Sequence, residues 1–123
     1  MSDDAASYIA AHPAASAKAL KTLRTFLAGR IAHAGVAVEE VMSYSMPGYR
    51  ILSGQGTGKM LMGYAAWKDH LAVYPHSGTV LPQMLKLTRG ISQTKSALHV
   101  PIGSLPPEAV IDQMIHLRLE ELH

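Results

Sequence analysis

The stretch that decides the fold of this chain is residues 59–74, which read KMLMGYAAWKDHLAVY. It contains two runs of strand length, rich in apolar and aromatic residues, separated by the polar pair Lys68-Asp69. Two such runs joined by two polar residues are typical of a β-hairpin. In the second run, large aliphatic residues alternate with His70, Ala72 and Tyr74. Because side chains alternate along a strand, these three share one face of the predicted sheet.

Further strands are predicted on both sides of this hairpin. Residues Tyr49–Ser53 form a short strand before the glycine-rich stretch 54–58, which we interpret as a hairpin loop. A last strand is predicted near Ala97–Ile102. Between Val36 and Met46 the pattern fits a helical turn as well as a strand. Because the connections between the strands are short, the sheet is expected to be largely antiparallel.

Helices are predicted at both ends of the chain. A short helix capped by Ser2 ends near Ala11, and a second begins with Pro13 at its first position and stops at Gly35. The second helix carries one apolar stripe with spacings of three and four: Ala17, Leu20, Leu23, Leu27, Ile31 and Ala34. Two more helices are predicted, one from a Thr79 cap to Gly90 and one opening at Pro106-Pro107-Glu108.

This order of elements predicts the fold class. Helices, then clustered strands, then helices are typical of an α+β arrangement rather than of alternating βαβ units. We therefore expect a single domain over residues 1–123, with N-terminal helices, a largely antiparallel sheet and a C-terminal helix packed on that sheet. The sequence shows no repeat and no linker.

Composition excludes several classes of protein. The 48% apolar content excludes a disordered tail, and the absence of cysteine excludes disulfides and thiolate catalysis. No apolar run approaches the roughly 18 residues that a membrane span needs. The acidic start lacks the features of a secretory signal, so a cytoplasmic location is expected.

Charge is distributed unevenly along the chain. The net charge is only +2, yet residues 41–107 hold six lysines and arginines against the single acid Asp69. This segment favours an anionic ligand over a cation. Basic residues are not densely clustered with aromatic ones, so a nucleic-acid partner is not predicted.

No catalytic motif is complete. The glycine-rich stretch 54–59 resembles a phosphate-binding loop only in part. Such a loop ending at Gly58-Lys59 needs a glycine at position 53 and a hydroxyl residue at position 60, where this chain has Ser53 and Met60. None of the seven histidines shares a spacing of four with another, and no Gly-x-Ser-x-Gly elbow occurs. The sequence therefore predicts no catalytic residues, and binding is favoured over enzymatic activity.

A set of polar and aromatic residues forms the candidate pocket. A pocket that is mostly apolar with a few convergent polar groups is the usual form of a ligand site. Alternatively, the tyrosines fasten the sheet to the helices, with their hydroxyls bonded locally. The sequence leaves both interpretations open for this set: Tyr44, Met46, Tyr49, Lys68, His70, Tyr74, His76 and Lys95.

Three motifs give the chain a resemblance to a known family. SYSMPGY at 43–49, YAAWKDH at 64–70 and YPHSG at 74–78 are similar, in this order, to motifs of the YdhG-like family of small bacterial domains. The resemblance covers most of the chain, from about Tyr8 to Leu119, although Ser96 and His99-Val100 depart from the pattern of the family's tail. It implies an α+β fold and no agreed catalytic residues. Some members are described as frataxin-like iron chaperones.

Three hypotheses of function follow. In the first, suggested by the resemblance, the chain is a small binding domain that handles iron through Glu39, Glu40, Asp69 and His70. In the second, the candidate pocket binds an anionic small molecule or a peptide terminus. In the third, the chain is a protein-interaction module that binds another protein or a second copy of itself, forming a homodimer.

Overall fold

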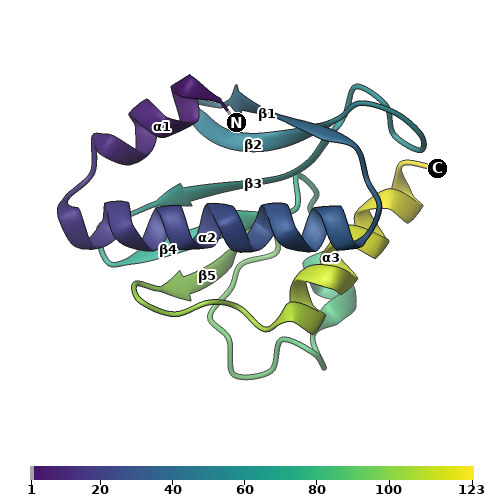
Figure 1. Cartoon of the computed structure of the whole chain (residues 1–123). Helices are drawn as coiled ribbons and strands as arrows, with labels where there is room; N and C mark the ends of the chain where they lie inside the picture. Colours follow the sequence, from purple (N-terminus) through teal and green to yellow (C-terminus); the bar gives the residue numbers. More distant parts are fainter. Residues whose placement is uncertain (1) are drawn as a thin grey trace.

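Figure 1 shows the computed structural model, which describes residues 2–123. Its centre is a five-stranded sheet in the order β1-β2-β3-β4-β5, in which every pair of neighbours is antiparallel. The order in the sheet is thus the order in the sequence. The strands are β1 (Val38–Ser43), β2 (Met46–Ile51), β3 (Met60–Ala66), β4 (His70–Tyr74) and β5 (Leu98–Pro101).

Three α-helices lie on one face of this sheet: α1 (Asp3–Ala10), α2 (Ala14–His33) and α3 (Glu108–Glu121). The long helix α2 runs across the sheet over β3 and β4, while α1 packs on β1 and β2 (Figure 1). Helix α3 contacts α2 and β3. The predicted α+β class, with N-terminal helices, an antiparallel sheet and a C-terminal helix packed on it, is confirmed.

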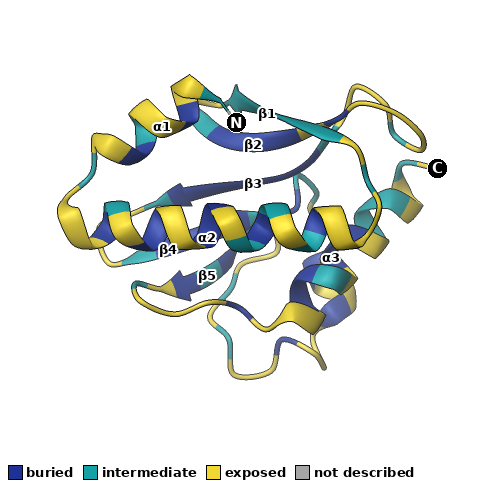
Figure 2. Ribbon diagram, viewed as in Figure 1, coloured by how far each residue is buried: buried dark blue, intermediate teal, exposed yellow. Residues whose placement is uncertain are grey.

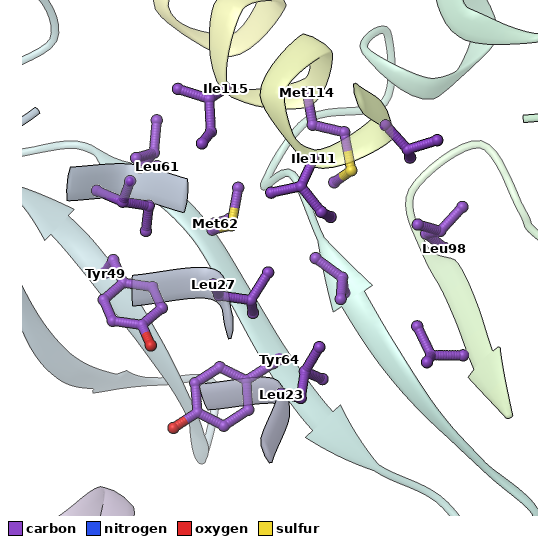
Figure 3. Close-up of a cluster of buried hydrophobic side chains, with 14 of the residues drawn as sticks. Leu23, Leu27, Tyr49, Leu61, Met62, Tyr64, Leu98, Ile111, Met114 and Ile115 are labelled. Carbon is purple, nitrogen blue, oxygen red and sulfur yellow. The ribbon is translucent and has the colours of Figure 1, made fainter. Parts of the chain in front are cut away.

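The core lies between the helices and the sheet. Figure 2 shows buried positions on the sheet-facing sides of α2 and α3 and along the central strands. In Figure 3, Leu23 and Leu27 of α2 lie over Tyr64 and Met62 of β3, and α3 contributes Ile111, all with 0% exposure. Burying one such aliphatic side chain contributes about 1.5–3 kcal/mol, so this layer holds the helices on the sheet.

The N-terminal helices begin close to where the sequence predicts. The Ser2 hydroxyl accepts a hydrogen bond from the backbone N–H of Ala5 at 3.2 Å, which makes Ser2 the N-cap of α1. Pro13 is the N-cap residue of α2 and not its first helical residue, so the helix begins one residue later than predicted. The apolar stripe is buried from Leu20 to Ile31, whereas Ala34 is exposed because α2 ends at His33.

The ambiguous segment 36–46 forms a strand and a tight turn. Strand β1 pairs with β2 from Val38↔Ile51 to Ser43↔Met46, so β2 begins three residues before the predicted Tyr49. The two turn residues, Tyr44 (φ 53°) and Ser45 (φ 62°), both have positive φ, as a type I′ hairpin turn requires. Local periodicity missed this hairpin because its turn lacks the usual Asn-Gly pair.

The helix predicted from Thr79 to Gly90 is wrong. The structure has only the short 3₁₀-helix η1 (Leu81–Met84), followed by turns. Thr79 caps no helix, because its hydroxyl donates to Glu121 of α3 at 2.7 Å. The first turn buries Leu81 and Met84 in the core, whereas Leu85 and Leu87 beyond it are exposed, so packing does not stabilise a longer helix.

The second face of the sheet is not covered by these helices. Leu71 and Val73 point to the helix face and are fully buried, as predicted from alternation. His70 and Tyr74 point to the opposite face and are half-buried. We call this opposite side the open face, and the candidate site lies on it.

Candidate functional site

A hollow of about 370 Å³ lies on the open face, between the turn that joins β1 to β2 and the chain that leaves β4. Tyr44 and Met46 form one side of it, and Tyr74 and His76 the other. We call it the tyrosine hollow. Its full lining comprises Tyr44, Met46, Tyr74, His76, Ser77, Gly78 and Ser96.

A glycine on β3 makes room for His76 beside the hollow. Gly63 pairs with Gly48 of β2 on one side and with Tyr74 of β4 on the other. A Cβ atom at Gly63 would lie 3.0 Å from Nε2 of His76 and 3.2 Å from the carbonyl oxygen of Pro47. The imidazole therefore rests directly on the sheet, at a place that any larger residue would occupy.

Two aromatic residues of the hollow have an unusual backbone. Tyr44 (φ 53°) and His76 (φ 54°) both adopt the left-handed region that L-residues rarely occupy. Their rings face each other, with centroids 6.4 Å apart and planes inclined by 25°. Such a conformation costs on the order of 1–3 kcal/mol per residue and is concentrated at functional sites. Tyr44 is nevertheless 85% exposed, so its ring is available to a ligand.

The hydroxyl of Tyr74 is held by Trp67. The indole Nε1–H of Trp67 donates a hydrogen bond to this hydroxyl oxygen at 2.8 Å. The two side chains reach each other across the cross-strand pair Ala65↔Ala72, both members of which are 1% exposed. Because an indole nitrogen only donates, the hydroxyl proton of Tyr74 stays free for another acceptor. Tyr74, which lines the hollow, thus has a hydroxyl that can still donate a hydrogen bond.

The loop after His76 is fastened to the end of α3. Glu121 accepts hydrogen bonds from the hydroxyls of Ser77 at 2.9 Å and Thr79 at 2.7 Å, and it forms an ion pair with Arg118. Arg118 also donates from Nε to the carbonyl oxygen of Met60, at the start of β3. Burial raises the pKa of Glu121, but the bonds from Thr79, Arg118 and Ser77 outweigh burial and lower it. Glu121 is therefore an anion that fixes this wall of the hollow.

His76 is neutral at physiological pH. Burial lowers the pKa of its imidazole, and the positive charge of Arg118 lowers it further. A neutral imidazole offers one N–H donor and one acceptor. On the opposite side, Ser96 sits in a tight turn whose backbone N–H donates to the Thr94 hydroxyl at 3.2 Å. The hollow therefore combines neutral hydrogen-bonding groups with aromatic surface, and the residues of its lining include no carboxylate.

The structure brings together half of the predicted pocket. Tyr44, Met46, Tyr74 and His76 share the tyrosine hollow. Two further residues adjoin the lining without joining it: Lys95 precedes Ser96 but lines a separate depression with Leu81 and Leu85, and Trp67 holds Tyr74.

Three predicted pocket residues lie elsewhere. Tyr49 is on the helix face, where its hydroxyl donates to the carbonyl oxygen of Arg24 at 3.2 Å, so for this residue the fastening role is the right interpretation. Burial raises the pKa of its hydroxyl. Lys68 is exposed in the β3–β4 turn. His70 lies in a second cleft of about 450 Å³, near that turn.

In that second cleft His70 meets two residues that sequence reasoning did not group. Its ring lies 4.4 Å from that of His99, and Nδ1 of His99 is 2.9 Å from the hydroxyl oxygen of Ser92. Burial, together with the charge that His70 would carry, lowers the pKa of His99. Asp69 also lines this cleft.

The four predicted iron contacts are not brought together. Glu40 is buried on the helix face, where it pairs with Arg24 and accepts a hydrogen bond from Tyr64 at 2.8 Å. Glu39 pairs with Arg50 on the open face. Asp69 and His70 are on the far side of β2 and β3. Within residues 2–123, no group of three His, Asp or Glu side chains is placed to hold a metal ion.

Sequence reasoning missed four contributors to the hollow: Trp67, Ser77, Gly78 and Ser96. Three of them lie within the motifs YAAWKDH and YPHSG, so their proximity to Tyr74 and His76 along the chain was the available signal. No such signal was available for Ser96, because only the pairing of β5 with β4 brings it to the hollow.

Comparisons with known proteins show a structural likeness. No family model matches the chain, and no curated protein sequence matches it. Among solved structures, the crystal structure of YdhG from Bacillus subtilis, a protein of the DUF1801 family, superposes with a TM-score of 0.75. The match covers 97% of this chain and 90% of that one. The fold is that of YdhG.

This result confirms the fold that the resemblance implies. At 15% sequence identity the likeness concerns the path of the backbone and transfers no activity to this chain. The chemistry of the chain therefore depends on its own side chains. None of the helices formed by residues 2–123 is both long and apolar enough to cross a membrane.

Proposed function

We propose that this chain is a binding domain for a small anionic molecule, a compact carboxylic acid or the carboxyl terminus of a peptide, and that the tyrosine hollow is its binding site. The observation that carries the proposal is the hydroxyl of Tyr74. It accepts from Trp67 and so keeps its own proton for another acceptor, and Tyr74 is one of the residues that line the hollow. Carboxylate oxygens are strong acceptors and cannot donate.

The surroundings of Tyr74 support an anion over a cation. The lining holds hydroxyls and a neutral imidazole but no carboxylate, and the nearby Glu121 is already paired with Arg118. Lys95 adjoins the lining through Ser96. The whole segment 41–107 carries an excess of positive charge, which raises the local concentration of anions.

The backbone of Tyr44 and His76 supports a role in binding rather than in folding. Neither residue is needed to fill the core, since Tyr44 is exposed and His76 is only half-buried. A residue that tolerates positive φ would form the same turn at lower cost. The conformational cost of positive φ at Tyr44 and His76 is explained if their two rings hold the flat or apolar part of a ligand while Tyr74 binds its carboxylate.

The two other hypotheses have less support. An iron-chaperone role remains a prediction from family resemblance, and the separation of Glu39 and Glu40 from Asp69 and His70 does not favour it. A role as a protein-interaction module or a homodimer also remains a prediction.

The test uses the fluorescence of Trp67, which is the chain's one tryptophan and contacts Tyr74. Benzoate, succinate and N-acetylglycylglycine are titrated as probes, and at least one should change the emission with saturation. Tyr74→Phe removes the proposed hydrogen bond to the probe, as well as the one from Trp67, and should weaken that probe by about three- to tenfold, a loss of ~0.5–1.5 kcal/mol. Lys68→Ala, in the exposed turn outside the hollow, is the matched control and should bind as the wild type does. Absence of saturable binding for all three probes, or equal losses in the two variants, would refute the proposal.

A further inference from the structure

A third cleft lies on the helix side of the molecule, away from the tyrosine hollow. It has a volume of about 570 Å³, larger than the tyrosine hollow and the cleft beside His70. One wall is the first half of α2 and the other is the loop that follows β5. We call it the Lys18 cleft. It is lined by Ala15, Lys18, Ala19, Thr22, Ile102, Gly103, Ser104 and Leu105.

The shape of this cleft comes from the sequence of its two walls. Ala15, Ala19 and Thr22 follow one another along a single face of α2, and small side chains there leave a trough beside the helix. The opposite wall is a tight turn in which the N–H of Ser104 donates to the carbonyl oxygen of Pro101 at 3.0 Å, with Gly103 at φ 90°. The buried Pro106 follows, so this wall is held in place without a ligand.

The interior of the cleft is mainly apolar. Leu105 is 44% exposed although it is a large aliphatic residue, and Ile102 is only partly buried beside it. Thr22 presents little polarity, because its hydroxyl donates to the carbonyl oxygen of Lys18 at 3.1 Å. An apolar molecule placed between these walls would remove Leu105 and Ile102 from water, which is favourable in proportion to the area covered.

Lys18 supplies the charge of the lining. Among residues 2–123, no carboxylate lies within ion-pair distance of its ammonium group, whereas Arg24 and Arg30 on the same helix each have acidic partners. A mostly apolar cleft with one convergent cation is complementary to a molecule with an apolar body and one negative charge. A carbon atom displaces about as much volume as a water molecule, ~30 Å³, so the cleft has room for roughly ten or more carbons.

We propose that the Lys18 cleft is a second binding site, independent of the tyrosine hollow, and that it takes a medium-chain amphipathic carboxylate. The alkyl or aryl body lies between Ala15 and Leu105, and the carboxylate pairs with Lys18. Ser104, which lines the same cleft, would donate its hydroxyl to this carboxylate.

The test is a titration of the whole chain with octanoate and, separately, with 1-octanol, followed by amide chemical shifts. Octanoate should shift the amides of residues 15–22 and 102–105 and bind at least threefold more tightly than 1-octanol. Lys18→Gln should remove that difference. Lys21→Gln, an exposed lysine of α2 outside the cleft, is the matched control and should keep it.

A second pair of variants tests the trough itself. Ala15→Leu places three further carbons at the cleft from an exposed position, and it should weaken octanoate tenfold or more without disturbing the core. Ala14→Leu, at the exposed neighbouring position outside the lining, should have no such effect. The proposal is overturned if octanoate shifts other amides instead, if both lysine variants lose affinity equally, or if Ala15→Leu binds as the wild type does.

Discussion

Replacing Gly63 by alanine should destabilise the protein and open the tyrosine hollow. The new Cβ would lie 3.0 Å from Nε2 of His76 and 3.2 Å from the Pro47 carbonyl oxygen, closer than ordinary contacts. Overpacking of this kind costs about 1–3 kcal/mol. Alanine also leaves the unfolded chain less conformational freedom than glycine does, which favours folding and offsets about 0.4–1 kcal/mol of that loss. From the middle of the two ranges we expect a net loss of about 1.3 kcal/mol, with a fall in Tm of about 4–7 °C for a chain of this size.

The assay is urea unfolding followed by Trp67 fluorescence, with the His76 pKa measured by NMR in parallel. Displacing the imidazole from the sheet should bring its pKa back up towards the ordinary value, since burial is the main cause of its lowering. Gly29→Ala is the control: nothing lies within 4 Å of its added Cβ on α2, so it should stabilise by about 0.5–1 kcal/mol. A Gly63→Ala variant at least as stable as the wild type, with an unchanged His76 pKa, would refute the packing of His76 on Gly63.

Three further predictions follow from other contacts. Glu40→Ala leaves Arg24, whose side chain is only 10% exposed, without its counter-charge. The free energy of unfolding, measured with urea, should fall by about 3–5 kcal/mol. The control Glu39→Ala removes an exposed ion pair and should lower it by under ~1 kcal/mol. Comparable losses for the two would contradict the buried pairing. Replacing Tyr44-Ser45 by Asn-Gly should stabilise the protein by about 1 kcal/mol, since asparagine and glycine tolerate the positive φ of this turn. The same replacement should abolish binding at the hollow. A drop in Tm would contradict the proposed strain in the turn. Because the folded-state pKa of His76 is lowered, the unfolded chain binds its proton more readily, so stability should decline as pH falls below about 6.5. His76→Gln should flatten that decline in denaturation measured at pH 7.5 and 5, and an unaltered slope would show that His76 does not cause it.

Half of the candidate site could be predicted because its residues lie in two short motifs. Tyr74 and His76 are separated by one residue, and Tyr44 lies in the turn that Met46 follows, so any fold that brings the two segments together unites them. Tyr49 was misplaced because it lies on a strand that begins earlier than expected. From Met46 onward, alternation turns Tyr49 to the helix face, where its hydroxyl reaches Arg24.

Lys68 and His70 were misplaced for a different reason. They lie close to Tyr74 in sequence, but a β-hairpin carries them to the end of the sheet opposite the hollow. The four expected iron contacts failed to meet for a related reason, since β2 and β3 separate β1 from β4. Because the strands lie in the sheet in the order of the sequence, β1 and β4 stay two strands apart, and periodicity along one segment does not show which strands are neighbours.

Short-range patterns in the sequence were enough to specify the helices at both ends, the central hairpin and the antiparallel α+β class, because each depends on spacing, caps and turn residues within a few positions. Which side chains share a cavity depended instead on tertiary packing. That packing placed His76 on Gly63, tied Ser77 and Thr79 to Glu121 over forty residues away, and assembled the Lys18 cleft from α2 and the loop after β5. These contacts join segments far apart in the chain, and the common hydrophobic core, rather than any local pattern, brings them together.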